Sequence, residues 1–158
     1  MKMSDKGLAA LRFDEGEKLT AYRDVAGILT IGIGHTGKVD GVRIHEGMKI
    51  TAGKSMELLR QDLAVSENCV NYFLKGKINQ HQFDALVNLV FNIGAGNFEK
   101  STVLRECLKG NFKKAGEAIC YWNKVTNPKT GKLETSKGLS NRRKRTRLMF
   151  DRGEYVTA

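Results

Sequence analysis

The chain has 158 residues, enough for one compact domain or two small lobes, and it carries a net charge of +10. The charge is uneven, since residues 1–79 hold 12 basic and 10 acidic residues and residues 80–158 hold 15 and 7. No apolar run reaches about 18 residues, which excludes a predicted transmembrane helix. The N-terminus lacks the apolar core of a signal peptide, so we expect a cytosolic chain. The basic balance favours a polyanionic partner: nucleic acid, an acidic membrane or an anionic cell wall.

The first predicted element is a helix that Ser4 caps and Gly16 ends. Leu8, Leu11 and Glu15 fall on one face of this helix, so Glu15 continues an apolar stripe and is expected to be partly buried. Glu15 also lies at the negative end of the helix macrodipole. Both features disfavour the ionised carboxylate, which suits a general acid at neutral pH.

Residues 21–45 have a different character. They contain five glycines and the alternation Ile31-Gly32-Ile33-Gly34, which indicates two or three short antiparallel strands joined by tight turns. The remainder has mostly helical periodicity. We expect helices from Thr51 to about Leu74, from Asn79 to Gly94, from Ser101 to Gly110, over 112–123 and over 139–151, with a polar loop over 127–138. The sequence therefore predicts an α+β fold with a sheet-bearing lobe, a helical lobe and a cleft between them.

Asp24 stands at a glycine-containing turn nine residues after Glu15. Such a setting is polar and hydrated, so Asp24 is expected to stay ionised. Two carboxyl groups in different environments are the equipment of glycoside hydrolysis. Thr30 is expected to share a strand face with Gly32 and Gly34, where the absence of side chains would let a polymer approach. A glutamate at a helix end and an aspartate in a turn are also common structural residues, and the residues alone leave both interpretations open.

The segment from Glu15 to Gly37 resembles the active-site signature of the phage-type lysozymes, glycoside hydrolase family 24. In that signature a Glu is followed by eight residues, an Asp, five residues and a Thr, as in Glu15, Asp24 and Thr30. Three further blocks resemble the same family, and the likeness covers nearly the whole chain: Phe91-Asn92-Ile93-Gly94, Ser101-Thr102-Val103-Leu104 and Gly138-Leu139-Ser140-Asn141-Arg142-Arg143. The lambdoid-type endolysins are the most similar group.

The resemblance implies a mainly helical lysozyme-like fold. It would form a single domain over 1–158, with a sheet-bearing lobe at about 17–50, a linking helix at about 51–75 and a helical lobe at about 76–158 together with the first helix. It implies a muramidase that hydrolyses the β-1,4 bond between N-acetylmuramic acid and N-acetylglucosamine in peptidoglycan and so lyses the bacterial host. Glu15 would protonate the leaving oxygen, while Asp24 and Thr30 would position and activate water. Inversion would require carboxyl groups about 6.5 to 9.5 Å apart.

Further expectations concern the surroundings of this site. By analogy with the family, substrate would contact Gly34, Thr36, Phe91, Asn92, Ser101 and Arg142. Arg142 is a candidate ion-pair partner of Glu15, and a cation there would oppose the effect of burial.

His35 is expected to hydrogen-bond Asp62, because scattered histidines offer no pair of metal ligands. No metal or cofactor is expected, and the three cysteines are interpreted as buried small hydrophobes. The basic residues Arg143, Lys144, Arg145 and Arg147 are interpreted as a solvated face that attracts an anionic wall or membrane.

Two other functions stay open. A lytic transglycosylase cleaves the same bond with the acid alone, and Asp24 at this spacing favours hydrolysis over it. A non-catalytic basic protein that binds cell wall or nucleic acid would also explain the basic tail, although no nucleic-acid-binding motif accompanies that tail. We therefore expect peptidoglycan as the partner, no nucleic acid, and a monomer that stays in the host cytoplasm until it is released to the wall.

Overall fold

Helix α1 (Asp5–Glu15) opens the computed structural model, which describes residues 1–158. The Ser4 side chain accepts a hydrogen bond from the amide of Gly7, which satisfies one of the free donors at the start of the helix. Gly16 ends the helix with φ of 75°, a conformation that glycine adopts without strain. The predicted first helix is confirmed at both ends.

A three-stranded antiparallel sheet follows α1, in the order β1-β2-β3. Its strands and the hairpin after them are β1 (Lys18–Arg23), β2 (Leu29–Gly32), β3 (His35–Thr36), β4 (Lys38–Val39) and β5 (Val42–Arg43). The predicted small sheet is confirmed, but strand β2 ends at Gly32. Gly34 lies in the turn before β3 with φ of 71°, so the predicted strand face shared with Thr30 does not extend to it.

The rest of the chain is mainly helical. Its helices are α2 (Ala52–Leu74), α3 (Gln80–Ile93), α4 (Ala95–Glu99), α5 (Thr102–Leu108), α6 (Phe112–Ile119) and α7 (Lys137–Arg152). The predicted caps Thr51, Asn79 and Ser101 each accept an amide hydrogen bond. Helix α4 was not predicted, and α6 ends at Ile119 instead of residue 123.

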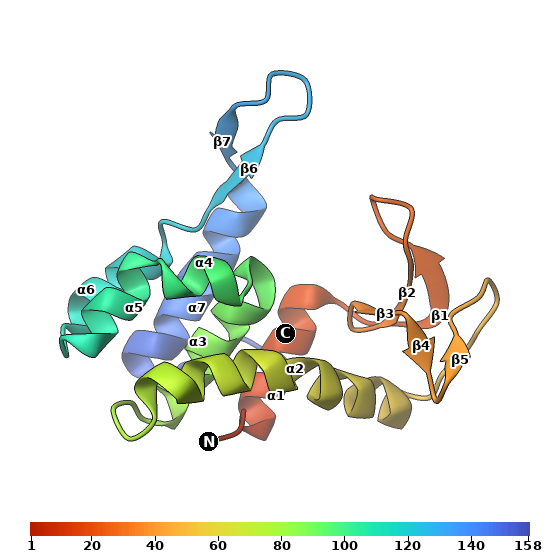
Figure 1. Ribbon diagram of the computed structural model, residues 1–158, viewed down its shortest axis with the longest axis horizontal. Helices are drawn as coiled ribbons and strands as arrows, with labels where there is room; N and C mark the ends of the chain where they lie inside the picture. Colours follow the sequence, from red (N-terminus) through yellow and green to blue (C-terminus); the bar gives the residue numbers. More distant parts are fainter.

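The predicted loop over 127–138 belongs in part to a hairpin of β6 (Lys124–Thr126) and β7 (Leu133–Thr135), so the loop prediction is wrong at its C-terminal side. All six strand residues are exposed, so no alternation of apolar and polar residues marks them as strands. The hairpin projects from the helical part of the molecule, on the same side as the β1–β2 hairpin (Figure 1).

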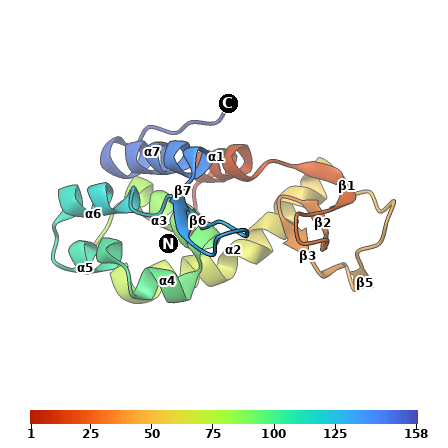
Figure 2. The same cartoon turned by 90° about the horizontal axis from the view of Figure 1, so that it is seen from above.

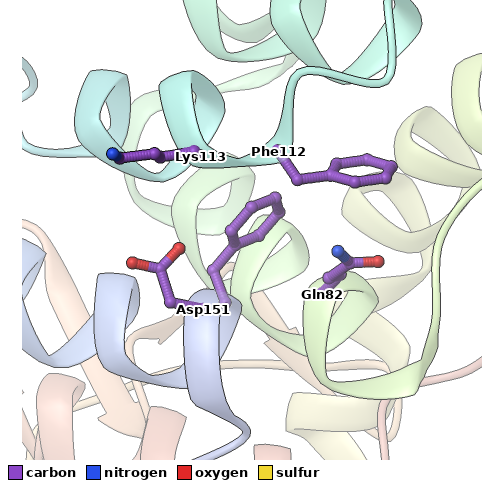
Figure 3. A pocket seen from close by; sticks show the side chains of 5 residues that line it. Gln82, Phe112, Lys113 and Asp151 are labelled. Carbon is purple, nitrogen blue, oxygen red and sulfur yellow. The ribbon is translucent and has the colours of Figure 1, made fainter.

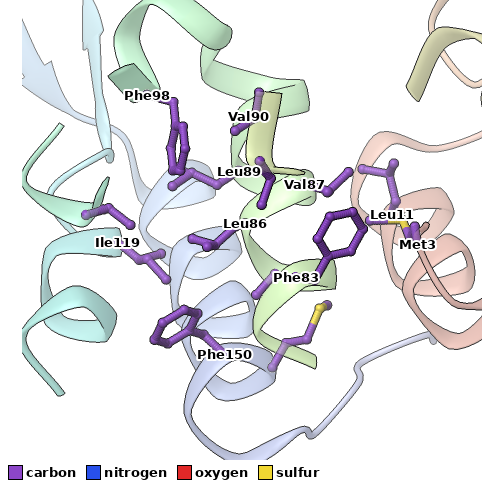
Figure 4. Packing of buried hydrophobic residues seen from close by; sticks show 14 of the residues in the cluster. Met3, Leu11, Phe83, Leu86, Val87, Leu89, Val90, Phe98, Ile119 and Phe150 are labelled. Carbon is purple, nitrogen blue, oxygen red and sulfur yellow. The ribbon is translucent and has the colours of Figure 1, made fainter. Parts of the chain in front are cut away.

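The main hydrophobic core contains 24 buried residues and surrounds α3, whose residues Phe83, Leu86 and Leu89 lie among side chains from α1, α6 and α7 (Figure 4). A second, smaller cluster joins Ile31, Val39 and Ile44 of the sheet region to Leu58 of α2. Helix α2 therefore packs against both clusters and connects the sheet to the helical body (Figures 1 and 2). The α+β prediction is confirmed. No helix is both long enough and apolar enough to cross a bilayer.

Candidate active site

Glu15 is the last residue of α1, and its side chain is 22% exposed. Its Oε1 lies 2.7 Å from Nη2 of Arg142, which α7 contributes. The Arg142 side chain is 9% exposed, so this pair is screened by solvent much less than a surface ion pair. The predicted Glu15–Arg142 pair is confirmed, and it brings together the first and last helices, which lie side by side in Figure 2.

Asp14, the neighbour of Glu15, supports this pair, and its carboxylate is only 3% exposed. It accepts hydrogen bonds from Nε of Arg145 at 2.9 Å and from Nδ2 of Asn88 at 3.0 Å. Asn88 in turn accepts a bond from Nη2 of Arg142 at 3.2 Å. A buried polar network from α1, α3 and α7 thus holds the end of α1. The sequence reasoning missed both residues: Asp14 stands in a charged stretch that is typical of a solvated helix end, and Asn88 stands among apolar residues that signal only a core face.

Asp24 lies in the turn between β1 and β2 and is half-buried. Its Oδ1 accepts hydrogen bonds from the amides of Ala26 and Ile28, each at 2.9 Å, so it is held only by its own turn. The predicted turn is confirmed. Thr30 on the central strand β2 is 3% exposed, and its hydroxyl donates to the Ile28 carbonyl at 2.9 Å.

The residues expected to contact substrate have unequal exposure. Gly34, Thr36 and Asn92 are exposed, while Phe91 is half-buried and packs against the main core. Ser101 is 4% exposed. Its hydroxyl caps α5 and donates to the Phe98 carbonyl at 2.7 Å. The expectation that Ser101 faces substrate is therefore corrected to a capping role.

Gly32 requires another correction. A Cβ at this position would come within 3.0 Å of Ser55 Oγ, and the backbone has φ of 66°. The space that the absent side chain leaves is occupied by α2, so it does not admit a polymer. At Gly34, by contrast, a Cβ would have no other atom within 4 Å, so this position stays open to a ligand.

His35 supports the sheet from β3. Its Nδ1 lies 2.8 Å from Oδ2 of Asp62 on α2, which confirms the predicted contact. Its Nε2 lies 2.7 Å from the Lys38 carbonyl. Burial lowers the pKa of His35, but the bonds to Lys38 and Asp62 outweigh it and leave the pKa raised. Both nitrogens face acceptors, and only the protonated ring donates from both.

The basic residues of α7 do not form a uniform solvated face. Arg143 is 1% exposed and Arg145 binds the buried Asp14, whereas Lys144 is exposed. The prediction is wrong for Arg143, because Arg143 lies on the same helix face as the buried residues Thr146 and Phe150, three and seven residues further on. That spacing was the signal available in the sequence.

None of the five cavities is lined by Glu15, Asp24 or Thr30, so the predicted cleft between the lobes stays a prediction. One cavity of about 260 Å³ lies where α3 and α6 begin and α7 ends, at Gln82, Phe112 and Asp151 (Figure 3). It lies at the opposite end of α7 from Arg142. Nowhere do three or more His, Cys, Asp or Glu residues gather as a metal site would require.

A small antiparallel sheet joined by a long helix to a helical body is the arrangement of a lysozyme, and the solved structures that this chain resembles include phage lysozymes. Sequence comparison narrows this class, because residues 12–146 match the model of the phage lysozyme family. The chain belongs to that family.

Similar proteins agree with this assignment. The endolysin of Salmonella phage P22 is 47% identical over 125 residues, which cover 79% of this chain and 86% of that protein. The structure of an endolysin from Escherichia coli O157:H7 phage FAHEc1 has a TM-score of 0.91 at 40% identity, covering 99% of this chain and 97% of that one. A P22 lysozyme variant has a TM-score of 0.84 at 42% identity, covering 95% and 98%. The chain is therefore a lysozyme-type glycoside hydrolase that acts on peptidoglycan.

Proposed function

We propose that this chain is an endolysin that hydrolyses the β-1,4 bond between N-acetylmuramic acid and N-acetylglucosamine. Glu15 is the general acid and protonates the glycosidic oxygen as the bond to C1 breaks. Water forms the new bond to C1 and gives up a proton to the Asp24 carboxylate, with Asp24 and Thr30 positioning and activating it. The proposal rests on one observation above all: Glu15 is held at the helix end by a buried cation, yet keeps 22% of its side chain open to solvent.

The contact with Arg142 distinguishes the enzyme without substrate, the resting enzyme, from the enzyme with substrate bound. In the resting enzyme the ion pair at 2.7 Å stabilises the Glu15 carboxylate and fixes its rotamer. In the working enzyme the exposed part of the Glu15 side chain meets the glycosidic oxygen, to which the acid transfers its proton. Asp14 and Asn88 keep Arg142 in place during this transfer, because their bonds to the network do not involve Glu15.

The attack of water from the face opposite the acid would invert the configuration at C1. Asp24 supports this route because its Oδ1 is used by two backbone amides, while no protein group binds its Oδ2. Thr30 is the central-strand neighbour of this turn, and its hydroxyl oxygen still has lone pairs for water.

Product analysis on purified peptidoglycan tests the proposal. In ¹⁸O-labelled water, we expect the wild-type enzyme to release fragments whose reducing N-acetylmuramic acid end contains ¹⁸O. We also expect NMR to show that the α anomer of this end forms first. Glu15→Gln is expected to abolish this activity with the fold retained, whereas Glu99→Gln, the same change at an exposed site on α4, is expected to leave it unchanged. Anhydro products without ¹⁸O would instead establish a transglycosylase. Wild-type-like clearing by Glu15→Gln would exclude Glu15 as the acid.

We further propose that the enzyme acts as a monomer. It would be one domain over 1–158, with a sheet-bearing lobe at about 17–50, a linking helix at about 51–75 and a helical lobe at about 76–158 together with the first helix. We also propose that its positive charge holds it near the anionic wall during lysis of the host. The net charge of +10 supports the electrostatic contact, and the phage endolysins among its relatives support the setting. Activity on whole cell walls should fall as salt rises, while activity on short uncharged oligosaccharides should not. Sedimentation at micromolar concentration tests the monomer.

A further inference from the structure

A cavity of about 480 Å³ lies at the base of the β6–β7 hairpin. The end of α3 lines it with Asn92, the hairpin with Lys124 and Val125, and α7 with Arg143. Trp122 adds an aromatic wall from the segment that leads into the hairpin. The cavity therefore joins apolar surface to two cations, a combination that suits a small organic anion.

Arg143 is the buried cation of this cavity, with 1% of the residue exposed. Its Nε donates to the Trp122 carbonyl at 2.7 Å and its Nη2 donates to the Asn92 side chain. Its Nη1 is buried and has no hydrogen-bond partner. Two other buried nitrogens share that condition, in His81 and Arg142, but neither residue lines this cavity.

Arg143 also has no counter-ion, because no carboxylate lies within 4 Å of it, whereas Arg142 and Arg145 both pair with acids. Burial and the neighbouring Arg142 lower the pKa of Arg143 to about 10, although the more distant charges of Asp14 and Glu15 oppose this change, so the guanidinium still carries its charge at neutral pH. A buried charge without a partner is unfavourable, and each unpaired buried donor calls for an explanation. An anion that reached Nη1 from this cavity would supply the missing acceptor and a directly bound negative charge.

We propose that this cavity binds a carboxylate of the peptide that peptidoglycan carries on N-acetylmuramic acid, an inference that rests on the proposed function. The lactyl-linked peptide begins on one of the two sugars that flank the scissile bond. Arg143 follows directly on Arg142, which binds Glu15, and the charge of Glu15 acts on Arg143, so this wall of the cavity lies within electrostatic range of the proposed acid. A carboxylate matches the planar donor fork of a guanidinium.

The hairpin strengthens this assignment. Lys124 is exposed at the cavity wall and adds a second positive charge, and Lys129 and Lys132 continue it into the exposed turn. The one acid of the hairpin, Glu134, lies opposite Val125 in the strand pair, and its carboxylate accepts a hydrogen bond from Asn127 Nδ2 at 2.9 Å. Attraction along the hairpin thus favours an anionic chain that leads into the cavity.

The test compares kcat/KM on intact glycan strands with kcat/KM on strands stripped of their peptides by an amidase. We expect wild type to prefer the intact strands, and Arg143→Gln to lower that preference about tenfold, the effect of losing one charge-assisted bond. Val125→Trp, which fills the cavity mouth from a residue that is 46% exposed, is expected to lower the preference similarly without disturbing the buried arginine.

Matched controls are Leu133→Trp, which adds the same ring on the hairpin outside the cavity lining, and Lys114→Gln, which removes an exposed charge from α6. Both are expected to keep the wild-type preference. If Val125→Trp also keeps it while wild type cleaves both substrates, the peptide site is excluded and the proposed function stands. If wild type cleaves neither substrate, the proposed function itself fails.

Direct binding gives a second readout. Free peptide released by the amidase should shift the Nε–H NMR resonance of Arg143 in wild type and leave it unshifted in Val125→Trp. Inorganic phosphate serves as the competing anion. Tighter binding of peptide than of phosphate supports the proposal, whereas equal or tighter binding of phosphate, or no shift with peptide, overturns it.

Discussion

The two carboxylates proposed for catalysis are held in opposite ways. Glu15 is positioned by Arg142, which lies 127 positions later in the sequence, and through it by a buried network across three helices. Asp24 is positioned only by amides two and four residues further along its own turn. One side of the proposed site is thus part of the core of the protein, whereas the other depends on a single hairpin.

This difference separates stability from chemistry. A change near Glu15 alters the packing of α1 on α3 and α7, so its effect on activity includes an effect on folding. A change at Asp24 leaves those helices untouched. Mutational data on the two residues are comparable only when the free energy of unfolding is measured beside the rate.

The largest expected effect on stability comes from removing the negative charge of Asp14, the residue before Glu15. Asp14→Asn leaves Arg142 and Arg145 without their shared acid and should lower the free energy of unfolding by about 3 to 5 kcal/mol. The same change at Asp24 should cost about 1 kcal/mol or less, because the asparagine amide oxygen still accepts from the turn amides and only the charge of a partly exposed group is lost. Urea unfolding of both variants measures the contrast. Equal losses would show that the turn is as important to the fold as the network.

A smaller effect, dependent on pH, is expected where the sheet meets α2. Because the pKa of His35 is raised in the folded state, its contribution is fully present below the unfolded value of about 6.5 and is lost as pH rises through the folded value. His35→Asn should therefore destabilise by about 1 to 3 kcal/mol near pH 5.5 and by clearly less near pH 8.5.

Unfolding curves at both pH values measure this change. His45→Asn is the control, since His45 is exposed and binds only the adjacent Glu46 carbonyl. A loss from His35→Asn that does not vary with pH would contradict the role of the protonated ring.

The smallest expected effect is a difference in stability between substitutions at two glycines, Gly32 at the end of β2 and Gly34 in the turn that follows. Gly32→Ala and Gly34→Ala both place a Cβ on a backbone with positive φ, at a cost of about 1 to 2 kcal/mol each. Gly32→Ala should cost about 1 kcal/mol more, because its Cβ meets Ser55 Oγ at 3.0 Å. Thermal unfolding measures the difference, and Ser55→Ala in the Gly32→Ala background should recover part of it. No recovery would mean that another contact limits the space.

Much of the fold follows from local patterns. The capping residues Ser4, Thr51 and Asn79 locate three helix starts because they act on amides only two or three residues away. The hairpin at 124–135 was missed for the opposite reason, since its exposed strands have no buried face to produce a period of two. The short helix α4 was missed because it has five residues and no side-chain cap.

The candidate site divides in the same way. The family resemblance assigned roles to Glu15, Asp24 and Thr30 from their spacing. The sequence also predicted the turn at Asp24 and the two side-chain pairs Glu15–Arg142 and His35–Asp62. The burial of Arg143 was not, since a run of basic residues is interpreted as solvated unless the helix face is known.

The sequence by itself determined the helix ends, the glycine-rich sheet and the order of the proposed catalytic residues, because these depend on interactions between near neighbours. Only the tertiary structure decided that Asp14 and Asn88 support the end of α1, that Ser101 is buried, and that Arg143 faces a cavity without a counter-ion. Such features arise when helices distant in sequence exclude water from a polar group, and its environment is then set by packing instead of by its neighbours in the chain.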